Sequence, residues 1–441
     1  MDSQNRKKVI IFTYYWPPCS SPGVWRFLKL SKYLLDYGWD PIIVTVKNGS
    51  YPNSDPSLLN DIPKEIKTYK TKTIEPFLIY NMLQGKKDKK VPEAMAGIKD
   101  SKKWYQRFSR FVRANMFIPD PRIGWRKYAV KQAEEIIKHE KIDAIITTSP
   151  PNSAHMIGLD IKKKFNIPWL MDFRDPWTSS YVNQLFLKRM DFVERKDKKM
   201  EDECLINADG VIGIGPGLLD EYSDRNKNIT VLYNGFDEDN FGDKVLDLKT
   251  DQFIISWVGN FKPNMQTVAF WEALDELIAE HKDFKDKFRV QFVGNIDPNV
   301  LQYLMDKQLD HLLIIQGFVK HEKALEYMKD SNLLLFIIPH SAYSKNIMSG
   351  KIFEYVASQT PMLSLGPVDG DAAVLVNQAE RAPMIAYEDK ESMKKSIMEH
   401  FNAWKANNGI SAKHNSDFSQ FTRKKLAGKL AKILNEISSN E

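Results

Sequence analysis

The sequence is short of the features that mark secreted, zinc-bound or membrane-spanning proteins. Its two cysteines, Cys19 and Cys204, are too few for a disulfide framework, and no Cys/His spacing is typical of a zinc site. No apolar run approaches the ~18 residues that a membrane span requires, and the longest, from Leu333 to Pro339, fits a buried strand. The first residues show no signal-peptide pattern. We therefore expect a cytoplasmic protein.

Length and charge set further bounds. At 441 residues the chain is too long for one ordinary core, which suggests two or three domains. The net charge of +6 is unevenly placed, because residues 86–131 hold 14 Lys/Arg against 4 Asp/Glu. Such asymmetry indicates an anionic partner for one patch rather than a generally basic protein, and we expect no nucleic acid among the partners.

Apolar strands alternate with helices in the first half of the chain. We expect strands at 9–13, 41–46, 144–148, 169–173, 208–214 and 230–233, and helices at 24–37, 128–139 and 154–165. This alternation predicts a parallel, doubly wound α/β sheet.

The same pattern restarts after the turn Asn234-Gly235 and an acidic stretch. Strands are expected at 253–258, 289–293, 312–316, 333–338 and 362–365, and helices at 267–281, 351–358 and 422–437. The first three of these strands stop at Gly259, Gly294 and Gly317, which suggests loops where the backbone approaches a ligand closely. We predict domains at 1–235 and 236–410 and a final helical segment at 411–441. Two tandem domains with separate roles are the alternative to one shared cleft, and the shared cleft is the more economical interpretation.

Residues 51–118 show little periodicity, but one segment within them is distinctive. Trp104, Phe108 and Phe111 share a helical face beside several cations, as in a helix that lies on an anionic membrane surface. Together with the charge excess over 86–131, this predicts peripheral binding to the inner face of the cell membrane. A helix packed on its own domain with solvated lysines is the equally weighted alternative.

Several motifs, in order, resemble those of bacterial family 4-like glycosyltransferases. They are Trp16-Pro-Pro-Cys-Ser-Ser-Pro-Gly-Val-Trp-Arg26, Tyr37-Gly-Trp-Asp-Pro41, Thr148-Ser-Pro-Pro-Asn-Ser-Ala-His155, Pro168-Trp-Leu-Met-Asp172-Phe-Arg174-Asp175-Pro-Trp177 and Ser349-Gly-Lys-Ile-Phe-Glu354-Tyr-Val-Ala-Ser-Gln-Thr-Pro361. The resemblance spans most of the chain and is weakest over 51–115.

This resemblance implies the GT-B fold, in which two Rossmann-like domains with parallel sheets face a central cleft. The first domain would bind the acceptor and the second a nucleotide-sugar donor, while the last helix crosses back to the first domain. Members of the family add sugars to polysaccharides, lipids or lipid-linked carriers, so a glycan or lipid-linked acceptor is expected. Retention of anomeric configuration is implied by the family alone.

The predicted donor site centres on Ser349, Gly350, Lys351 and Glu354. Glycine allows close backbone approach, serine can cap the following helix, and Lys351 adds positive charge for a diphosphate without any metal. An ordinary capped helix with an exposed lysine is the structural alternative. Glu354 matches the family's second glutamate, whose carboxylate accepts hydrogen bonds from ribose hydroxyls.

The chain departs from the family pattern at Asn346, where the first glutamate of the motif would stand and contact the transferred sugar. Asn260 and Lys262, after Gly259, stand where the family often places a basic diphosphate contact, although a solvent-facing loop lysine is an equal alternative. Asp369-Gly-Asp371 is expected to be a turn rather than a metal motif. We predict no essential metal and no cofactor besides the nucleotide sugar.

In the first domain we select Asp172, Arg174, Asp175 and His155 as catalytic candidates. Three charges at the end of a strand are costly unless they are exposed in a cleft or paired. Asp172 could be the base for the acceptor hydroxyl, and Arg174 could stabilise the departing phosphate. The alternatives are a structural Asp–Arg pair and a structural histidine. Gly23, in the loop Ser20-Ser-Pro-Gly23, could line the donor or the acceptor, and we place it among the donor-binding residues.

Two other functions are weighed against a glycosyltransferase. A sugar-nucleotide epimerase shares the architecture, but no acid/base constellation is evident in the second domain. A catalytically silent carbohydrate-binding or scaffold subunit of a polysaccharide assembly complex is supported mainly by Asn346.

Overall fold

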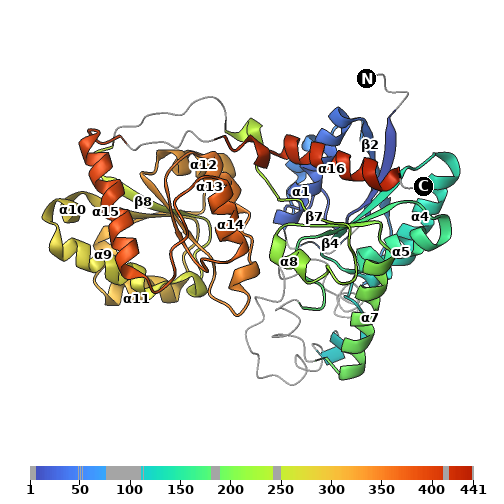
Figure 1. The fold of residues 1–441 in the computed structure, drawn as a ribbon, viewed down its shortest axis with the longest axis horizontal. Coiled ribbons are helices and arrows are strands. Elements are labelled where there is room, and N and C mark those ends of the chain that lie inside the picture. Colours follow the sequence, from blue (N-terminus) through green and yellow to red (C-terminus); the bar gives the residue numbers. More distant parts are fainter. Residues whose placement is uncertain are drawn as a thin grey trace. The chain divides into compact units, whose positions relative to one another are not determined.

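The computed structural model contains two compact units, each built around a parallel sheet (Figure 1). It describes residues 6–47, 49, 51, 53–75, 111–112, 114–179, 189–241, 250–410 and 417–439. Most of the aromatic and basic segment between Lys86 and Arg113 therefore lies outside the described residues. The first unit comprises Met1–Tyr233 with Arg423–Glu441, and the second comprises Asn234–Thr422.

The first unit holds seven parallel strands in the order β3-β2-β1-β4-β5-β6-β7. The strands are β1 Lys7–Phe12, β2 Trp39–Val46, β3 Lys67–Thr71, β4 Ala144–Ser149, β5 Trp169–Phe173, β6 Gly210–Gly213 and β7 Ile229–Val231. Its helices are α1 Pro22–Leu34, α4 Arg126–His139, α5 Ser153–Phe165, α7 Asp191–Asn207, α8 Pro216–Asp220 and α16 Arg423–Ser438.

Helices cover both faces of this sheet because its strands are apolar on both sides. Along β1, Ile10 and Phe12 pack in the cluster formed with α4 and α5, while Val9 and Ile11 pack in the cluster with α1 and α16. The last helix of the chain thus completes the core of the first unit. Figure 1 shows it, in red, against α1.

The second unit holds five parallel strands in the order β10-β9-β8-β11-β12. They are β8 Phe253–Val258, β9 Phe288–Val293, β10 Leu313–Gly317, β11 Leu333–Ile337 and β12 Met362–Leu365. The helices are α9 Val268–Glu280, α10 Lys282–Lys287, α11 Pro298–Asp306, α12 His321–Asp330, α13 Lys351–Ala357, α14 Asp371–Gln378 and α15 Lys390–Ala406. One core cluster joins the sheet to α9, α10, α11 and α15.

Short 3-10 turns connect these elements, at Leu35–Tyr37, Pro56–Asp61, Ile123–Trp125, Glu238–Asn240, Pro263–Met265, Asp310–Leu312, Ser344–Asn346 and Ser419–Phe421. Within the described part of the chain, none of the helices combines the length and apolar character needed to cross a membrane. The prediction of two doubly wound parallel α/β domains is confirmed.

Candidate functional site

Three glycines converge at the carboxyl edge of the second sheet. They follow or end the neighbouring strands β8, β9 and β10, and their φ angles are +119° at Gly259, +126° at Gly294 and +68° at Gly317. Gly294 donates its N–H to the carbonyl of Gly317 at 2.7 Å. A Cβ atom on Gly294 would lie 2.5 Å from the Gly259 carbonyl oxygen. Both the left-handed backbone and the close packing therefore require glycine at this edge.

Lys351 begins α13 and extends over the backbone of Gly259. A Cβ atom on Gly259 would lie 2.3 Å from the Lys351 Nζ. The Nζ is 4.2 Å from the ring centroid of Trp257, whose Nε1 donates a hydrogen bond to the Gly259 carbonyl at 3.0 Å. No described residue forms a hydrogen bond or ion pair with this ammonium group. Desolvation lowers the pKa of Lys351 from 10.5 to about 8, with Glu354 opposing that shift and Lys262 adding to it.

Glu354 lies one turn after Lys351 on the same side of α13. Its Oε1 accepts a hydrogen bond from Nε2 of His321, the first residue of α12, at 2.9 Å. Its Oε2 has no hydrogen-bond partner in the described part of the chain. This carboxylate is partly exposed, so one oxygen is held in place while the other remains able to accept hydroxyl groups.

The residues just before α13 differ in part from expectation. The N-cap of the helix is Gly350, and the helix has no side-chain cap, so Ser349 does not cap it as predicted. Apart from its chain neighbours and its own helix, no described residue would lie within 4 Å of a Cβ atom added to Gly350. The protein's own packing therefore does not require glycine at this position, in contrast to Gly259.

Two neighbouring loops complete this surface. Lys262 is exposed in the loop after β8, close enough for its charge to lower the pKa of Lys351. Asn346 is exposed in the turn Ser344–Asn346. The predicted turn at Asp369 is present, because Gly370 donates its N–H to the Pro367 carbonyl at 3.2 Å.

In the first unit, Asp172 is fully buried and paired with Arg26 rather than with Arg174. Its Oδ1 accepts from Arg26 Nη2 at 2.6 Å, and its Oδ2 accepts from Thr148 Oγ1 at 2.6 Å. The side chains of Arg26 and Asp172 are 2% and 0% exposed. Arg26 also donates to the carbonyl of Tyr233 at 2.9 Å. The geometry favours a structural Asp–Arg pair over a catalytic base.

Arg174 and Gly23 are brought together at the carboxyl edge of this sheet. A Cβ atom on Gly23 would lie 1.6 Å from Nη1 of Arg174, so the guanidinium rests on the glycine backbone at the start of α1. Within the described residues, this guanidinium has no hydrogen-bond or ion-pair partner. Asp175, the next residue, is exposed. These two charged groups are available to a ligand, whereas Asp172 is not.

His155 lies in the core of the first unit. It is fully buried in α5, its Nδ1 is 2.8 Å from Thr147 Oγ1, and its ring packs 4.6 Å from Phe173 and 5.9 Å from Trp177. Burial lowers the pKa of His155 to about 3, so the ring is neutral near pH 7. These contacts favour the structural interpretation, and His155 is not part of the proposed site.

Sequence reasoning did not select Trp257, His321 or Arg26 as site residues. Trp257 is the next-to-last residue of β8 and His321 follows β10, so both lie towards the sheet edge of the glycines, and that position is the signal that could have found them. Arg26 belongs to the opening motif, but its partner across the sheet could not be inferred from spacing.

No protein-family model and no curated protein matches the sequence. Solved structures do match along nearly the whole chain. Sucrose-phosphate synthase from Thermosynechococcus elongatus is 13% identical over 98% of this chain and 97% of its own, with a TM-score of 0.58. TarM is 11% identical over 99% of this chain and 100% of its own, with a TM-score of 0.59. The chain has the GT-B fold.

The GT-B fold alone does not separate the candidate activities. A putative UDP-N-acetylglucosamine 2-epimerase from Listeria monocytogenes also matches, at 12% identity over 99% of this chain and 98% of its own, with a TM-score of 0.52. At these identities the comparisons show the fold alone, so the proposed reaction rests on the side chains of the site.

Proposed function

We propose that this GT-B protein is a glycosyltransferase that takes its sugar from a nucleotide-sugar donor bound on the second domain. The observation that carries this proposal is Lys351, a desolvated lysine that lies over the backbone of Gly259 with no described anionic partner in contact. A diphosphate bound there would accept hydrogen bonds from the ammonium group. It would also pair with the positive charge that burial disfavours. The same ion pair would stabilise the negative charge that develops on the diphosphate as the sugar leaves.

Glu354 supplies the second half of the donor site in this proposal. Its Oε2 would accept hydrogen bonds from ribose hydroxyls, while His321 holds Oε1 at 2.9 Å and fixes the orientation of the carboxylate. The open space beside Gly350 suits a ligand that lies along the start of α13. TarM from S. aureus has been solved with fondaparinux, alpha-GlcNAc-glycerol and UDP, which supports a nucleotide as the ligand class on this fold.

In the proposed reaction, a hydroxyl oxygen of the acceptor bonds to the anomeric carbon of the sugar. The bond between that carbon and the diphosphate oxygen breaks, and the diphosphate leaves with its electron pair, stabilised by Lys351. The hydroxyl proton passes to a base, and Asp175 is an exposed carboxylate of the first domain that could accept it. Arg174, beside Gly23, is proposed to contact a phosphate or hydroxyl group.

The finer features of this proposal rest on the sequence resemblance and on the charge pattern. They are membership of the family 4-like group, retention of configuration, a reaction without a metal, and a glycan or lipid-linked acceptor at the inner face of the cell membrane. Residues 86–131, proposed to contact an anionic membrane, lie largely outside the described residues.

Replacing Glu354 with Ala is expected to weaken nucleoside diphosphate binding by roughly 10- to 100-fold, because hydrogen bonds to a charged group contribute ~1.5–3 kcal/mol. Glu354 is partly exposed, so the variant should unfold at nearly the wild-type temperature. Isothermal titration calorimetry with UDP, GDP and ADP measures the first effect and differential scanning calorimetry the second. Glu326→Ala on α12, an exposed glutamate away from the site, is the control.

Radiolabelled nucleotide sugars then separate the activities. Transfer to an acceptor or slow hydrolysis that depends on Glu354 supports a glycosyltransferase, whereas release of an isomerised sugar indicates an epimerase. A large loss of thermal stability in the Glu354 variant with unchanged nucleotide affinity would mark this residue as structural.

A further inference from the structure

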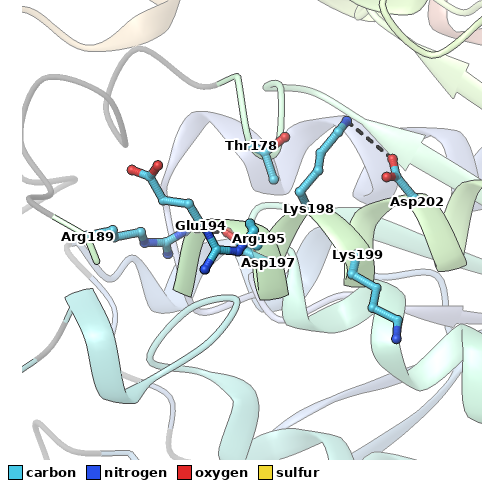
Figure 2. Close-up of a pocket in the computed structure, with 8 residues that line it drawn as sticks. All are labelled: Thr178, Arg189, Glu194, Arg195, Asp197, Lys198, Lys199 and Asp202. Carbon is cyan, nitrogen blue, oxygen red and sulfur yellow. Dashed lines mark hydrogen bonds and ion pairs between the residues drawn. The ribbon is translucent and has the colours of Figure 1, made fainter. Parts of the chain in front are cut away.

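A cavity of about 640 Å³ lies along the first three turns of α7 in the first unit (Figure 2). It is lined by Thr178, by Arg189 and by charged side chains that α7 presents. Nothing in the proposed donor site uses these residues. Helix α7 is therefore a second place where charged groups gather around a space large enough for a ligand.

The cations of this cavity are only partly neutralised by the protein. The side chain of Arg189 is 6% exposed, pairs with Asp197 and donates to the Pro119 carbonyl, yet its buried Nε atom has no hydrogen-bond partner among the described residues. Arg195 and Lys199 are exposed and form no hydrogen bond or ion pair with any described residue. Glu194 is the lining carboxylate that is likewise unpaired in the described part of the chain.

The remaining lining carboxylates are already paired. Asp197 binds Arg189, and Asp202 binds Lys198 at 3.2 Å, as the dashed line in Figure 2 marks. Among the described lining residues, the Arg195 guanidinium and the Lys199 ammonium are therefore the cations that remain available to an anion. Guanidinium groups are well suited to phosphate oxygens because their N–H groups form a planar fork.

Exposed apolar side chains also lie at the start of α7 and in the segment that is hydrogen-bonded to it. Phe192 is 56% exposed and lies one turn before Arg195 and two turns before Lys199, on one face of α7. Met190 and Met116 are 38% and 71% exposed. The segment that carries Met116 is held against the start of α7, because the Asn115 Oδ1 accepts from the Met190 N–H at 2.8 Å.

A single exposed apolar residue is ordinary, but three around the start of a helix that also carries unpaired cations match a ligand with two parts. A soluble anion would need the cations alone. An amphiphile places its anionic head on the cations and its tail on the apolar side chains.

We propose that the α7 cavity binds the phosphate group of an amphiphilic acceptor, with its hydrocarbon part against Phe192, Met190 and Met116. The identification of this ligand as the acceptor rests on the proposed glycosyltransferase function; the binding site itself does not. Glu194 would accept a hydrogen bond from a hydroxyl of the ligand's head group.

Calorimetric titration of the full-length protein with decyl phosphate, kept below its micellar concentration, tests the site. The Arg195→Gln/Lys199→Gln variant is expected to bind at least about tenfold more weakly. Lys196→Gln, a matched control on the same helix that removes an exposed lysine outside the cavity, should bind within about twofold of wild type. Phe192→Ser should weaken binding of decyl phosphate but leave the weaker binding of methyl phosphate unchanged.

Three results would overturn the proposal. One is unchanged decyl phosphate affinity in the double variant, and another is an equal loss in Lys196→Gln, which indicates general surface attraction. The third is binding to phosphatidylglycerol vesicles, but not to phosphatidylcholine vesicles or monomeric decyl phosphate, which indicates membrane docking instead of a head-group pocket.

Parallel titration with UDP, GDP and ADP separates this inference from the proposed function. Decyl phosphate binding that depends on Arg195 and Lys199, without binding of any nucleotide, would support the α7 site and refute only the donor assignment. Nucleotide binding without decyl phosphate binding would support the donor site and refute the α7 site.

Discussion

Replacing Lys351 with Met is expected to weaken nucleoside diphosphate binding by roughly 10- to 100-fold and to make the protein more stable. The loss of affinity follows from removal of a charge-assisted contact that contributes ~1.5–3 kcal/mol. The gain in stability follows from removal of a desolvated charge. Methionine is an apolar chain of similar length, and it can pack against the Trp257 ring, over which the Lys351 ammonium now lies.

The lowered pKa of Lys351 also predicts the direction in which the free energy of unfolding changes with pH. The pKa of Lys351 falls from 10.5 to about 8 in the folded protein, so the unfolded chain binds more protons between these values. The free energy of unfolding of the wild type should therefore gain a contribution as pH rises from about 8 to about 10.5. The Met variant should lack this contribution and be more stable by roughly 1 kcal/mol at pH 7.

Urea unfolding at pH 7 and pH 10, with calorimetric titration of UDP, GDP and ADP, measures both effects. Lys405→Met is the matched control, because Lys405 is an exposed lysine on α15 of the second unit that pairs with Asp283 on α10. It should change neither quantity appreciably. A Lys351 variant that is less stable and binds as wild type does would show that the lysine serves the fold.

Replacing Arg26 with Met is expected to destabilise the first unit by about 3–5 kcal/mol, because it leaves the Asp172 carboxylate buried without its partner. The double variant Arg26→Met/Asp172→Leu should recover a large part of this loss, since two apolar side chains can replace a buried ion pair. Arg6→Met breaks the partly exposed pair between Arg6 and Asp40 and should cost at most about 1 kcal/mol.

Chemical denaturation of the four proteins, including wild type, measures these differences. The same variants test the role of Asp172, because a structural pair predicts that activity in the double variant follows the folded fraction. If the double variant is fully folded, binds nucleotide and has lost all turnover, Asp172 is the catalytic base after all. That result would place Asp172 among the catalytic residues despite its burial.

Much of the fold could be predicted from the sequence because the central strands are apolar on both faces. The predicted strands at 169–173, 253–258 and 362–365 match β5, β8 and β12 at both ends. Strand β3 was missed because it is an edge strand in which only Thr71 is buried, which leaves little periodicity. Helix α7 was missed because it is rich in charged residues and because two of the side chains that it buries, Asp197 and Glu201, are themselves charged.

The site was predictable where its residues are close in the sequence. Lys351 and Glu354 stand one turn apart, so a single motif indicated both. The hydrogen bond between His321 and Glu354 joins residues 33 positions apart, and the pair between Arg26 and Asp172 joins residues 146 apart. Such contacts depend on strand order and on which strand ends meet at one edge, which local spacing does not specify.

The central claim is that Lys351 and Glu354 form a nucleoside diphosphate site, and calorimetric titration of the wild-type protein across pH tests it most directly. At least one of UDP, GDP and ADP should bind, with an affinity that is steady below about pH 8. Above that pH, the affinity should fall by about tenfold per unit as the Lys351 ammonium loses its proton. Absence of binding by all three at millimolar concentration, or an affinity that stays constant to pH 10, would contradict the account.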